Sequence, residues 1–345
     1  MGQPVKVVQF GLGPIGQGVA RLVHDTPALK IVGAIDIDPD KAKKDLGAVL
    51  GLSQKLKVKV EADPVRALRT LKGDVAVLCT SSSAREVKEQ VLALVKRGLH
   101  VVTTCEELAF PAPENRAVQR EIDAAAQKKK VAVLATGVNP GFAMDALAQM
   151  LTAPCTHVNR VSVTRVVDAG TRRLPLQRKV GAGLNLAQFR HAMTQKSVRH
   201  VGLVESVYMV AAGLGWALDK VEETLEPAIA PRDLETEYLR IPAGSAAGIK
   251  QVARGYREGL LAVSLDLQMY VGAESPRDHV LIDGTPPIDM TIAGGIAGDT
   301  ATAAMVVNAI PRLLQARPGF LTMRDIPLVH CFNAQDLKDL PKRRR

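Results

Sequence analysis

The sequence predicts an α/β protein in which a doubly wound parallel sheet precedes a second, α+β domain built on a mainly antiparallel sheet. Between Val5 and Ala135, short apolar runs alternate with helical segments. Such alternation is typical of a parallel sheet with right-handed crossovers. Beyond residue 141 the pattern changes, and residues 261–271 alternate apolar and polar side chains. That period of two indicates a strand with one buried face, as in antiparallel sheets.

The expected elements follow from these two patterns. In the first half we expect strands at 5–10, 30–36, 56–60, 74–79, 99–103 and 131–135, and helices at 14–24, 84–97 and 113–129. In the second half we expect strands at 157–168, 219–226, 248–258, 261–271 and 286–293, and helices near 140–151, 185–195 and 203–217. Gly298-Asp299-Thr300 should start a late helix over 301–315 that packs on the first domain.

A glycine-rich loop joins the first strand to the first helix. It consists of Gly11, Leu12, Gly13, Pro14, Ile15 and Gly16. The first glycine permits the turn, the second lets a pyrophosphate approach the backbone, and the third lets the helix pack on the strand. Asp36 ends the second strand at the spacing expected for a carboxylate on an adenosine ribose. These features predict a Rossmann-type domain that binds NAD(P)H.

The same acid bears on the choice of cofactor. A carboxylate accepts a hydrogen bond from a ribose 2′-hydroxyl and repels a 2′-phosphate, so Asp36 favours NAD. Lys41 and Lys43 are expected in the next helix and could reach a phosphate. NADP therefore stays open as an alternative.

The chain length favours two domains, because single cores stop growing at about 250 to 300 residues and this chain has 345. We expect a dinucleotide-binding domain over 1–138 and a substrate and dimerisation domain over 139–298. Residues 299–345 should form a helix and tail that return to the first domain.

The composition excludes several classes of partner. Although the net charge is +10, the one dense basic run is the terminal segment 342–345, and aromatic residues are 3%, so we expect no nucleic-acid partner. No apolar stretch approaches the ~18 residues of a membrane span, and we recognise no signal peptide. The four cysteines (Cys79, Cys105, Cys155, Cys331) form no C-x-x-C pair, so we expect no metal, no disulfide and a cytoplasmic location.

Two strand ends carry polar residues suited to chemistry. Glu106 and Glu107 follow the strand at 99–103, where a carboxylate could move protons beside a nicotinamide or merely cap a helix. Cys105 lacks an evident base and is expected to be a buried thiol. After the strand at 74–79, the hydroxyls of Thr80, Ser81 and Ser82 suit either cofactor contacts or helix capping.

Further candidates lie beyond the first domain's last strand. Asn139 has an amide that can bind a ligand or form a turn. Arg165 lies on an otherwise apolar strand face, which suggests a binding pocket or a buried ion pair with Asp168 as an available neighbour. His191 and His200 are isolated histidines, which are more often structural than catalytic.

Together these segments resemble the 2,4-diaminopentanoate dehydrogenase and native amine dehydrogenase family, whose fold is akin to dihydrodipicolinate reductase. The resemblance rests on the glycine loop and on residues 103–108, 136–145, 200–206 and 298–303. It implies reversible oxidative deamination of an amine with NAD(P)⁺, or reductive amination of a ketone or aldehyde with ammonia. It also implies a homodimer formed through the second-domain sheet.

The resemblance assigns roles to individual residues. The family's acid/base falls on Glu106, with Glu107 as second choice, while Asn139, Arg165 and His200 line the substrate pocket. Val167 stands where the diaminopentanoate type carries a polar amide, which favours a small, mainly apolar amine. Two alternatives remain: a diamino- or amino-acid dehydrogenase whose Arg165 binds a carboxylate, and a non-catalytic dinucleotide-binding sensor.

Overall fold

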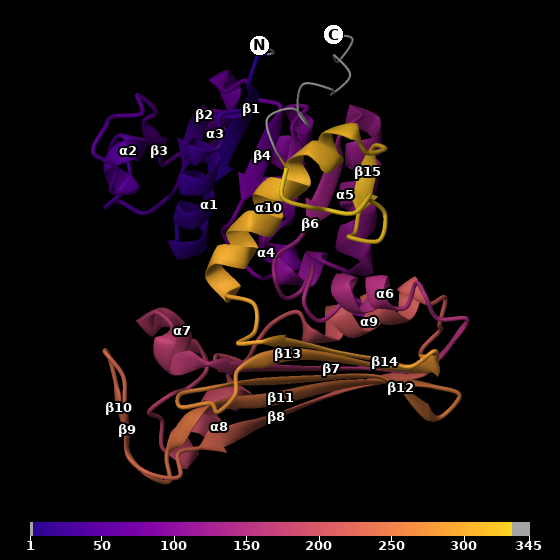
Figure 1. Cartoon of the computed structure of the whole chain (residues 1–345). Helices are drawn as coiled ribbons and strands as arrows, with labels where there is room; N and C mark the ends of the chain where they lie inside the picture. The colour runs from indigo at the N-terminus through magenta and orange to yellow at the C-terminus, as the bar shows by residue number, and fades with distance from the viewer. Residues whose placement is uncertain (1–2, 333–345) are drawn as a thin grey trace. The chain divides into compact units, whose positions relative to one another are not determined.

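The computed structural model describes residues 3–332 and divides into two compact units (Figure 1). The first unit comprises the chain up to Phe142 together with the chain from Ala297 onward, and the second comprises Ala143–Ile296. The basic segment 342–345 lies outside the described residues. No helix in the described part of the chain is long and apolar enough to cross a membrane.

The first unit is built on a seven-stranded parallel sheet with the order β15-β6-β5-β4-β1-β2-β3. Its strands are β1 (Val5–Phe10), β2 (Leu29–Ile35), β3 (Val60–Glu61), β4 (Val75–Leu78), β5 (His100–Thr103), β6 (Ala132–Ala135) and β15 (Gly319–Leu321). Its α-helices are α1 (Pro14–Asp25), α2 (Leu46–Val49), α3 (Pro64–Thr70), α4 (Ala84–Lys96), α5 (Arg116–Lys129) and α10 (Gly298–Gln315). The strand order reverses at β1, as in doubly wound sheets.

Two separate apolar clusters cover the two faces of this sheet. One cluster joins the sheet to α1 and α10 through residues such as Val19 and Ile310. The other joins it to α4 and α5 through residues such as Val91 and Ile122. Because both faces are buried, β4 and β6 are continuous apolar runs. The predicted doubly wound parallel sheet is confirmed, and α10 packs against α1 as expected.

The second unit contains a six-stranded sheet with the order β14-β13-β7-β12-β11-β8, in which only β7 and β12 pair in parallel. Its strands are β7 (His157–Asp168), β8 (Lys220–Ile229), β11 (Ala246–Arg257), β12 (Leu260–Tyr270), β13 (Arg277–Thr285) and β14 (Ile288–Ala293), with a small pair β9 (Leu234–Glu235) and β10 (Arg240–Ile241). Its α-helices are α6 (Ala146–Leu151), α7 (Leu174–Lys179), α8 (Leu186–Thr194) and α9 (Leu203–Gly213). The predicted α+β architecture is confirmed.

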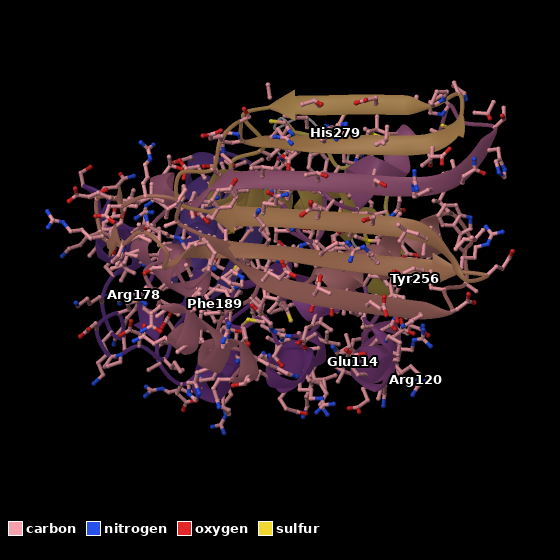
Figure 2. The ribbon with its side chains drawn as sticks, turned by 90° about the horizontal axis from the view of Figure 1, so that it is seen from below. Glu114, Arg120, Arg178, Phe189, Tyr256 and His279 are labelled. Carbon is pink, nitrogen blue, oxygen red and sulfur yellow. The ribbon has the colours of Figure 1, made fainter. Side chains whose placement is uncertain are left out.

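The two faces of this sheet differ in composition. Val163 and Leu265 are buried on the face against which α9 packs. The opposite face, which Figure 2 shows toward the viewer, carries Tyr256 and His279 among mainly polar side chains. We call this second surface the outer face of the six-stranded sheet.

Three expectations about individual elements are wrong. The strand expected at 56–60 is reduced to the two residues of β3, because Lys57 has a left-handed backbone with φ of +57°. The helix expected at 140–151 begins only at Ala146, since the preceding residues form turns and Gly141 has φ of +121°. Lys41 and Lys43, expected in a helix, lie in a turn. In addition, the strand β13 was not expected at all.

Gly16→Ala tests how strongly the first unit depends on the contact between α1 and the glycine loop. A Cβ at Gly16 would lie 2.1 Å from the carbonyl oxygen of Gly11, so the backbone must shift. We expect a loss of about 1–3 kcal/mol in the free energy of unfolding, measured by urea denaturation.

Gly18→Ala is the matched control in the same helix. A Cβ at Gly18 would meet the Cβ of Ala303 at 4.0 Å, an ordinary contact. This change should stabilise the protein by about 0.5–1 kcal/mol because alanine is the better helix former. Equal stability of the two variants would contradict the prediction.

Candidate active site

The glycine loop after β1 is shaped by how closely the backbone approaches itself. A Cβ at Gly11 would lie 2.3 Å from the carbonyl oxygen of Cys79, and the φ of +91° there also favours glycine. At Gly13, by contrast, a Cβ would meet nothing within 4 Å. Gly13 precedes α1 without a side-chain cap, and Pro14 takes the first helical position. The first turn of α1 therefore presents backbone N–H groups to open space, which favours an anion.

The carboxylate of Asp36 ties this loop to the end of β2. Its Oδ2 accepts a hydrogen bond from the Leu12 N–H at 2.6 Å, and its Oδ1 accepts one from the Asp38 N–H at 2.8 Å. Lys41 Nζ lies 2.7 Å from Asp38 Oδ2 and 4.0 Å from Asp36 Oδ2. The Asp36 side chain is thus held in place, while each of its oxygens keeps a second lone pair for a hydroxyl donor.

The hydroxyls after β4 contact the helix that follows them. Thr80 and Ser81 donate hydrogen bonds to side chains of α4 at 2.6 Å and 2.5 Å. Ser81 Oγ also accepts from the Ser83 N–H at 3.1 Å. These contacts show a local structural role for the first two hydroxyls, and cofactor contacts by Thr80, Ser81 and Ser82 stay a prediction.

The two acids after β5 differ in their surroundings. Glu107 Oε2 accepts from the Ala84 N–H at 2.9 Å and from Asn115 Nδ2 at 3.3 Å. Glu107 therefore connects the start of α4 to the segment that precedes α5. Glu106 is half-buried and begins a short 3₁₀ turn (Glu106–Leu108) at the carboxyl end of β5. In a doubly wound sheet this end of the strands is where ligands bind.

The thiols of Cys79 and Cys105, near this strand end, are poorly suited to nucleophilic chemistry. Burial raises the pKa of Cys79 to about 11, with the charge of Glu106 adding to the increase. Burial likewise raises the pKa of Cys105, and Glu106 contributes there too. Both thiols stay protonated near neutral pH, so neither supplies a thiolate. Cys105 is the buried residue that we expected.

Asn139 lies in the loop after β6 with both amide atoms buried. Neither its Oδ1 nor its Nδ2 contacts a hydrogen-bond partner within residues 3–332, and Thr136 Oγ1 nearby in the sequence is in the same condition. A buried polar group left unpaired costs about 1–3 kcal/mol, so such groups point to a polar ligand or water. The loop itself is held by the Val138 N–H, which donates to Thr302 Oγ1 at 3.3 Å.

In the second unit, Arg165 forms a buried ion pair. Its Nη1 donates to Asp278 Oδ1 at 2.6 Å, and its Nη2 donates to the carbonyl oxygen of Ile296 at 2.7 Å. The Ile296 N–H in turn donates to Asp278 Oδ2 at 2.7 Å. The neighbour expected from the sequence, Asp168, instead accepts hydrogen bonds from two backbone N–H groups. Of the two interpretations left open, the ion pair is confirmed, with a different partner.

The imidazole of His200 is neutral, and the backbone of His200 is held by two hydrogen bonds to the side chain of Gln251. Its N–H donates to Gln251 Oε1 and its carbonyl oxygen accepts from Gln251 Nε2, both at 2.8 Å. Its Nδ1 is buried without a hydrogen-bond partner within residues 3–332. Burial lowers the pKa of the imidazole to about 3, and the charges of Lys179 and Arg165 contribute. The neutral ring has one nitrogen that donates and one that accepts.

Val167 continues the strand face of Arg165. The two residues are two positions apart on β7, so their side chains point to the same side of the sheet. Val167 is half-buried and pairs in register with Met269, whose side chain is buried. The position is therefore apolar.

Comparison with known proteins identifies the family. Residues 142–342, more than half of the chain, match the model of the 2,4-diaminopentanoate dehydrogenase C-terminal domain. The chain belongs to the 2,4-diaminopentanoate dehydrogenase family. Residues 5–136 match the model of the dihydrodipicolinate reductase N-terminus. The resemblance inferred from the motifs is confirmed, and membership in a family of dehydrogenases makes the chain an oxidoreductase rather than a non-catalytic sensor.

Relatives of this family align over nearly the whole chain. The 2,4-diaminopentanoate dehydrogenase of Acetoanaerobium sticklandii is 30% identical, covering 98% of this chain and 97% of that protein. The amine dehydrogenase of Streptomyces virginiae is 25% identical, covering 94% and 96%. The structure of an amine dehydrogenase from Mycobacterium smegmatis has a TM-score of 0.84 at 23% identity, covering 96% of this chain and 98% of that chain, and so shows the shared fold.

Two buried polar residues of this family member were not singled out from the sequence. Asp278 lies on β13, a strand that we did not expect, so its pairing with Arg165 was not foreseen. Gln251 holds the backbone of His200 and lies at a buried position of β11. Gln251, like Arg165, is a polar residue on an otherwise apolar strand face. The same pattern could therefore have identified Gln251 from the sequence. His191, in contrast, is an exposed residue of α8.

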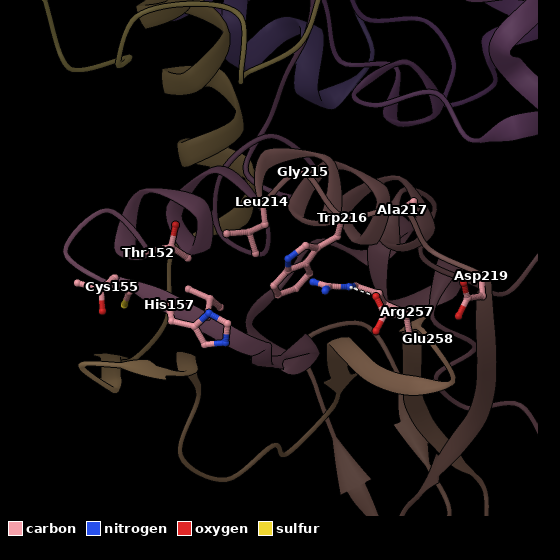
Figure 3. A pocket seen from close by; sticks show the side chains of 12 residues that line it. Thr152, Cys155, His157, Leu214, Gly215, Trp216, Ala217, Asp219, Arg257 and Glu258 are labelled. Atoms are coloured by element: carbon pink, nitrogen blue, oxygen red, sulfur yellow. Dashed lines mark hydrogen bonds and ion pairs between the residues drawn. The ribbon is translucent and has the colours of Figure 1, made fainter.

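A separate pocket opens in the second unit, with a volume of about 810 Å³ (Figure 3). It is lined at its centre by Trp216, whose ring lies 5.7 Å from the Arg257 guanidinium. None of the predicted site residues lines it. Its charged groups are engaged locally, Arg257 with Glu258 and Asp219 with the Gly259 N–H. We assign it no part in the dehydrogenase site.

Gly13→Ala tests the anion site at the start of α1. Because a Cβ at Gly13 meets nothing within 4 Å, the fold should tolerate it, and the urea midpoint should stay close to that of the wild type. The methyl group would, however, stand in the open space where we expect the pyrophosphate. We expect NADH affinity to fall at least about tenfold by fluorescence titration. Undiminished affinity would show that the cofactor binds elsewhere.

Proposed function

We propose that this oxidoreductase is an NAD(P)-dependent amine dehydrogenase. It would catalyse reversible oxidative deamination of a small amine, or reductive amination of a ketone or aldehyde with ammonia. The observation that carries the proposal is the similarity over nearly the full length to relatives named 2,4-diaminopentanoate dehydrogenase and amine dehydrogenase. The free thiols of all four cysteines (Cys79, Cys105, Cys155, Cys331) support our proposal of a reducing, cytoplasmic compartment.

The residues of the first unit fit a nicotinamide dinucleotide. The loop from Gly11 to Gly16 would take the pyrophosphate at the start of α1, and Asp36 would accept a ribose hydroxyl. When bound, the dinucleotide supplies the hydride acceptor or donor. We propose NAD(H) as the favoured cofactor because of Asp36. Lys41, held 2.7 Å from Asp38, supports some use of NADP(H).

We propose that Glu106 carries out the proton transfers. In reductive amination, ammonia would add to the carbonyl and water would leave, and the dinucleotide would supply the hydride that reduces the resulting iminium cation. Glu106 can pass two protons in turn to the departing oxygen, one that ammonium gives up on becoming the nucleophile ammonia and one from the attacking nitrogen. It ends ionised and can then stabilise the iminium cation by charge. The orphaned amide of Asn139 and the neutral imidazole of His200 can donate and accept hydrogen bonds to the substrate.

The substrate should be small and mainly apolar. Val167 offers no hydrogen bond to the second amine or the carboxylate of a diamino acid, and Asp278 already pairs with Arg165. The competing proposal, a 2,4-diaminopentanoate-type dehydrogenase, is supported by the 30% identical relative. In that case Arg165 would bind the substrate carboxylate.

We also propose a homodimer formed through the outer face of the six-stranded sheet. The support is that this face, which extends over six adjacent strands, carries mainly polar side chains together with Tyr256 and His279 (Figure 2). This oligomer is the one that the family resemblance implies.

Glu106→Gln tests the acid/base assignment. The change keeps size and most hydrogen-bonding capacity but removes the charge and the ability to carry a proton. Since general acid–base catalysis contributes about 10²- to 10⁴-fold, kcat at saturating ammonia should fall at least about 100-fold, with NADH affinity little changed.

Glu107→Gln is the control for this variant. Glu107 accepts from the Ala84 N–H and from Asn115, and a glutamine oxygen can still do so, hence the loss in kcat should be mild. More than about a tenth of wild-type turnover in Glu106→Gln would argue against the assignment, and a severe loss in Glu107→Gln would move the role to that residue.

A panel of carbonyl compounds, assayed for NAD(P)H consumption with and without ammonium, tests the reaction and its substrate class. An unpaired polar group buried beside Val167 costs about 1–3 kcal/mol, or roughly 5- to 150-fold in specificity. Small alkyl ketones or aldehydes should therefore exceed 2-amino-4-oxopentanoate in kcat/KM. A higher value for the diamino acid precursor would favour the competing proposal, and consumption independent of ammonium would refute both.

Asp36→Ala tests the cofactor preference. Removing a charged acceptor for the ribose hydroxyl should lower the ratio of kcat/KM for NADH over NADPH by about tenfold or more. The ratio is a suitable readout because both cofactors use the same glycine loop, so a general loss of stability affects them alike. An unchanged ratio would remove Asp36 from the determinants of preference.

A further inference from the structure

The pairing of Asp278 with Arg165 bears on which substrates the proposed site can accept. The Asp278 side chain is fully buried, and that of Arg165 is 3% exposed, so the pair is removed from water. Both oxygens of Asp278 are used, one by Arg165 Nη1 at 2.6 Å and the other by the Ile296 N–H at 2.7 Å. The Ile296 carbonyl accepts from the other terminal nitrogen of Arg165 and completes a ring of three residues.

The three residues of this ring carry no net charge. This affects whether a charged or an uncharged substrate can bind beside Arg165. A substrate carboxylate beside it would add a second negative charge to a guanidinium whose charge Asp278 already balances. Arg172 is the other cation whose charge acts on Arg165. Burying an excess charge is unfavourable unless it is paired. An uncharged substrate incurs no such cost. Asp278 thereby disfavours the binding of carboxylated ligands, and disfavouring the wrong ligand is one way in which a protein achieves specificity.

We propose that Asp278 is a specificity-determining residue that withholds the charge of Arg165 from carboxylated substrates. The inference rests on the proposed function, because it takes Arg165 to line the substrate pocket. It is independent of Val167, which disfavours polar groups through a missing hydrogen bond rather than through charge. Asp278 acts through Arg165 and is a positioning residue, not a catalytic one.

The test compares two ligands that differ in charge but hardly in shape, 4-oxopentanoate and 4-oxopentanamide. For the wild type, kcat/KM in reductive amination should favour the amide at least about tenfold. Asp278→Asn keeps the size of the side chain and leaves the Arg165 charge unbalanced. The ratio of kcat/KM for the carboxylate over the amide should then rise at least about tenfold.

Asp283→Asn provides the matched control. Asp283 lies on the same strand, its side chain is 49% exposed, and it lies 3.8 Å from Arg160. This variant loses the same charge from the same strand, and its substrate ratio should stay at the wild-type value. If Asp278→Asn lowers activity on both compounds equally, Asp278 is merely structural and the inference is wrong.

A second variant separates the charge of Arg165 from a general effect on the fold. Asp278→Asn combined with Arg165→Gln replaces the ion pair by two neutral amides, so no buried charge is left unpaired. The gain for the carboxylate should disappear in this double variant. A gain that persists without Arg165 would overturn the inference.

Binding measurements on the wild type test the inference without any catalytic turnover. They also do not depend on whether the Asp278→Asn variant folds. In calorimetric titrations of the wild type saturated with NAD⁺, the amide should bind at least about tenfold more tightly than the carboxylate. Equal or tighter binding of the carboxylate would overturn the inference. Failure of the proposed function looks different, since no carbonyl compound would then support ammonium-dependent oxidation of NAD(P)H.

Discussion

The first unit depends on one backbone constraint, the close approach of the chain to itself around Gly11. The loop passes so near β4 that a Cβ at Gly11 would lie 2.3 Å from the Cys79 carbonyl, and α1 begins so near the loop that a Cβ at Gly16 would lie 2.1 Å from the Gly11 carbonyl. Asp36 adds a hydrogen bond from the end of β2 to Leu12. Three strand ends and a helix N-terminus are thereby fixed together. An anion site assembled from backbone N–H groups requires such rigidity, because those groups cannot be re-aimed by rotamer changes.

Strands whose residues follow a local pattern could be predicted from the sequence, whereas a strand that depends on a distant contact could not. The bounds of β1 and β7 were predicted correctly because unbroken apolar or period-two patterns define them. The strand β13 was missed because Asp278 stands on the buried face, where the pattern requires an apolar residue. Its partner Arg165, 113 residues away in the sequence, accounts for an acid at that position. A local pattern carries no information about such a contact.

The candidate site likewise contains some features that the sequence predicts and others that it does not. The glycine loop and Asp36 could be predicted because their spacing along the chain reflects a local strand-turn-helix geometry. Spacing alone does not separate Glu106 from Glu107, since adjacent acids after a strand look alike in sequence, and the preference for Glu106 comes from the family resemblance. The structure adds that Glu107 accepts hydrogen bonds from the start of α4 and from Asn115. The unpaired amide of Asn139 is likewise a property of burial, which the sequence does not display.

The charges of the second unit fit the proposed chemistry. Reductive amination passes through a cationic iminium, and a cationic side chain facing it would oppose its formation by Coulomb repulsion, which is strongest where water is excluded. Burial keeps His200 neutral, with its pKa lowered to about 3, and Asp278 balances the charge of Arg165. Under the proposed function, His200 and the paired Arg165 therefore add no net positive charge of their own to the substrate pocket, although the charge of Lys179 also acts on His200. Under the proposed function, the stabilising negative charge would then come from a single carboxylate, that of Glu106.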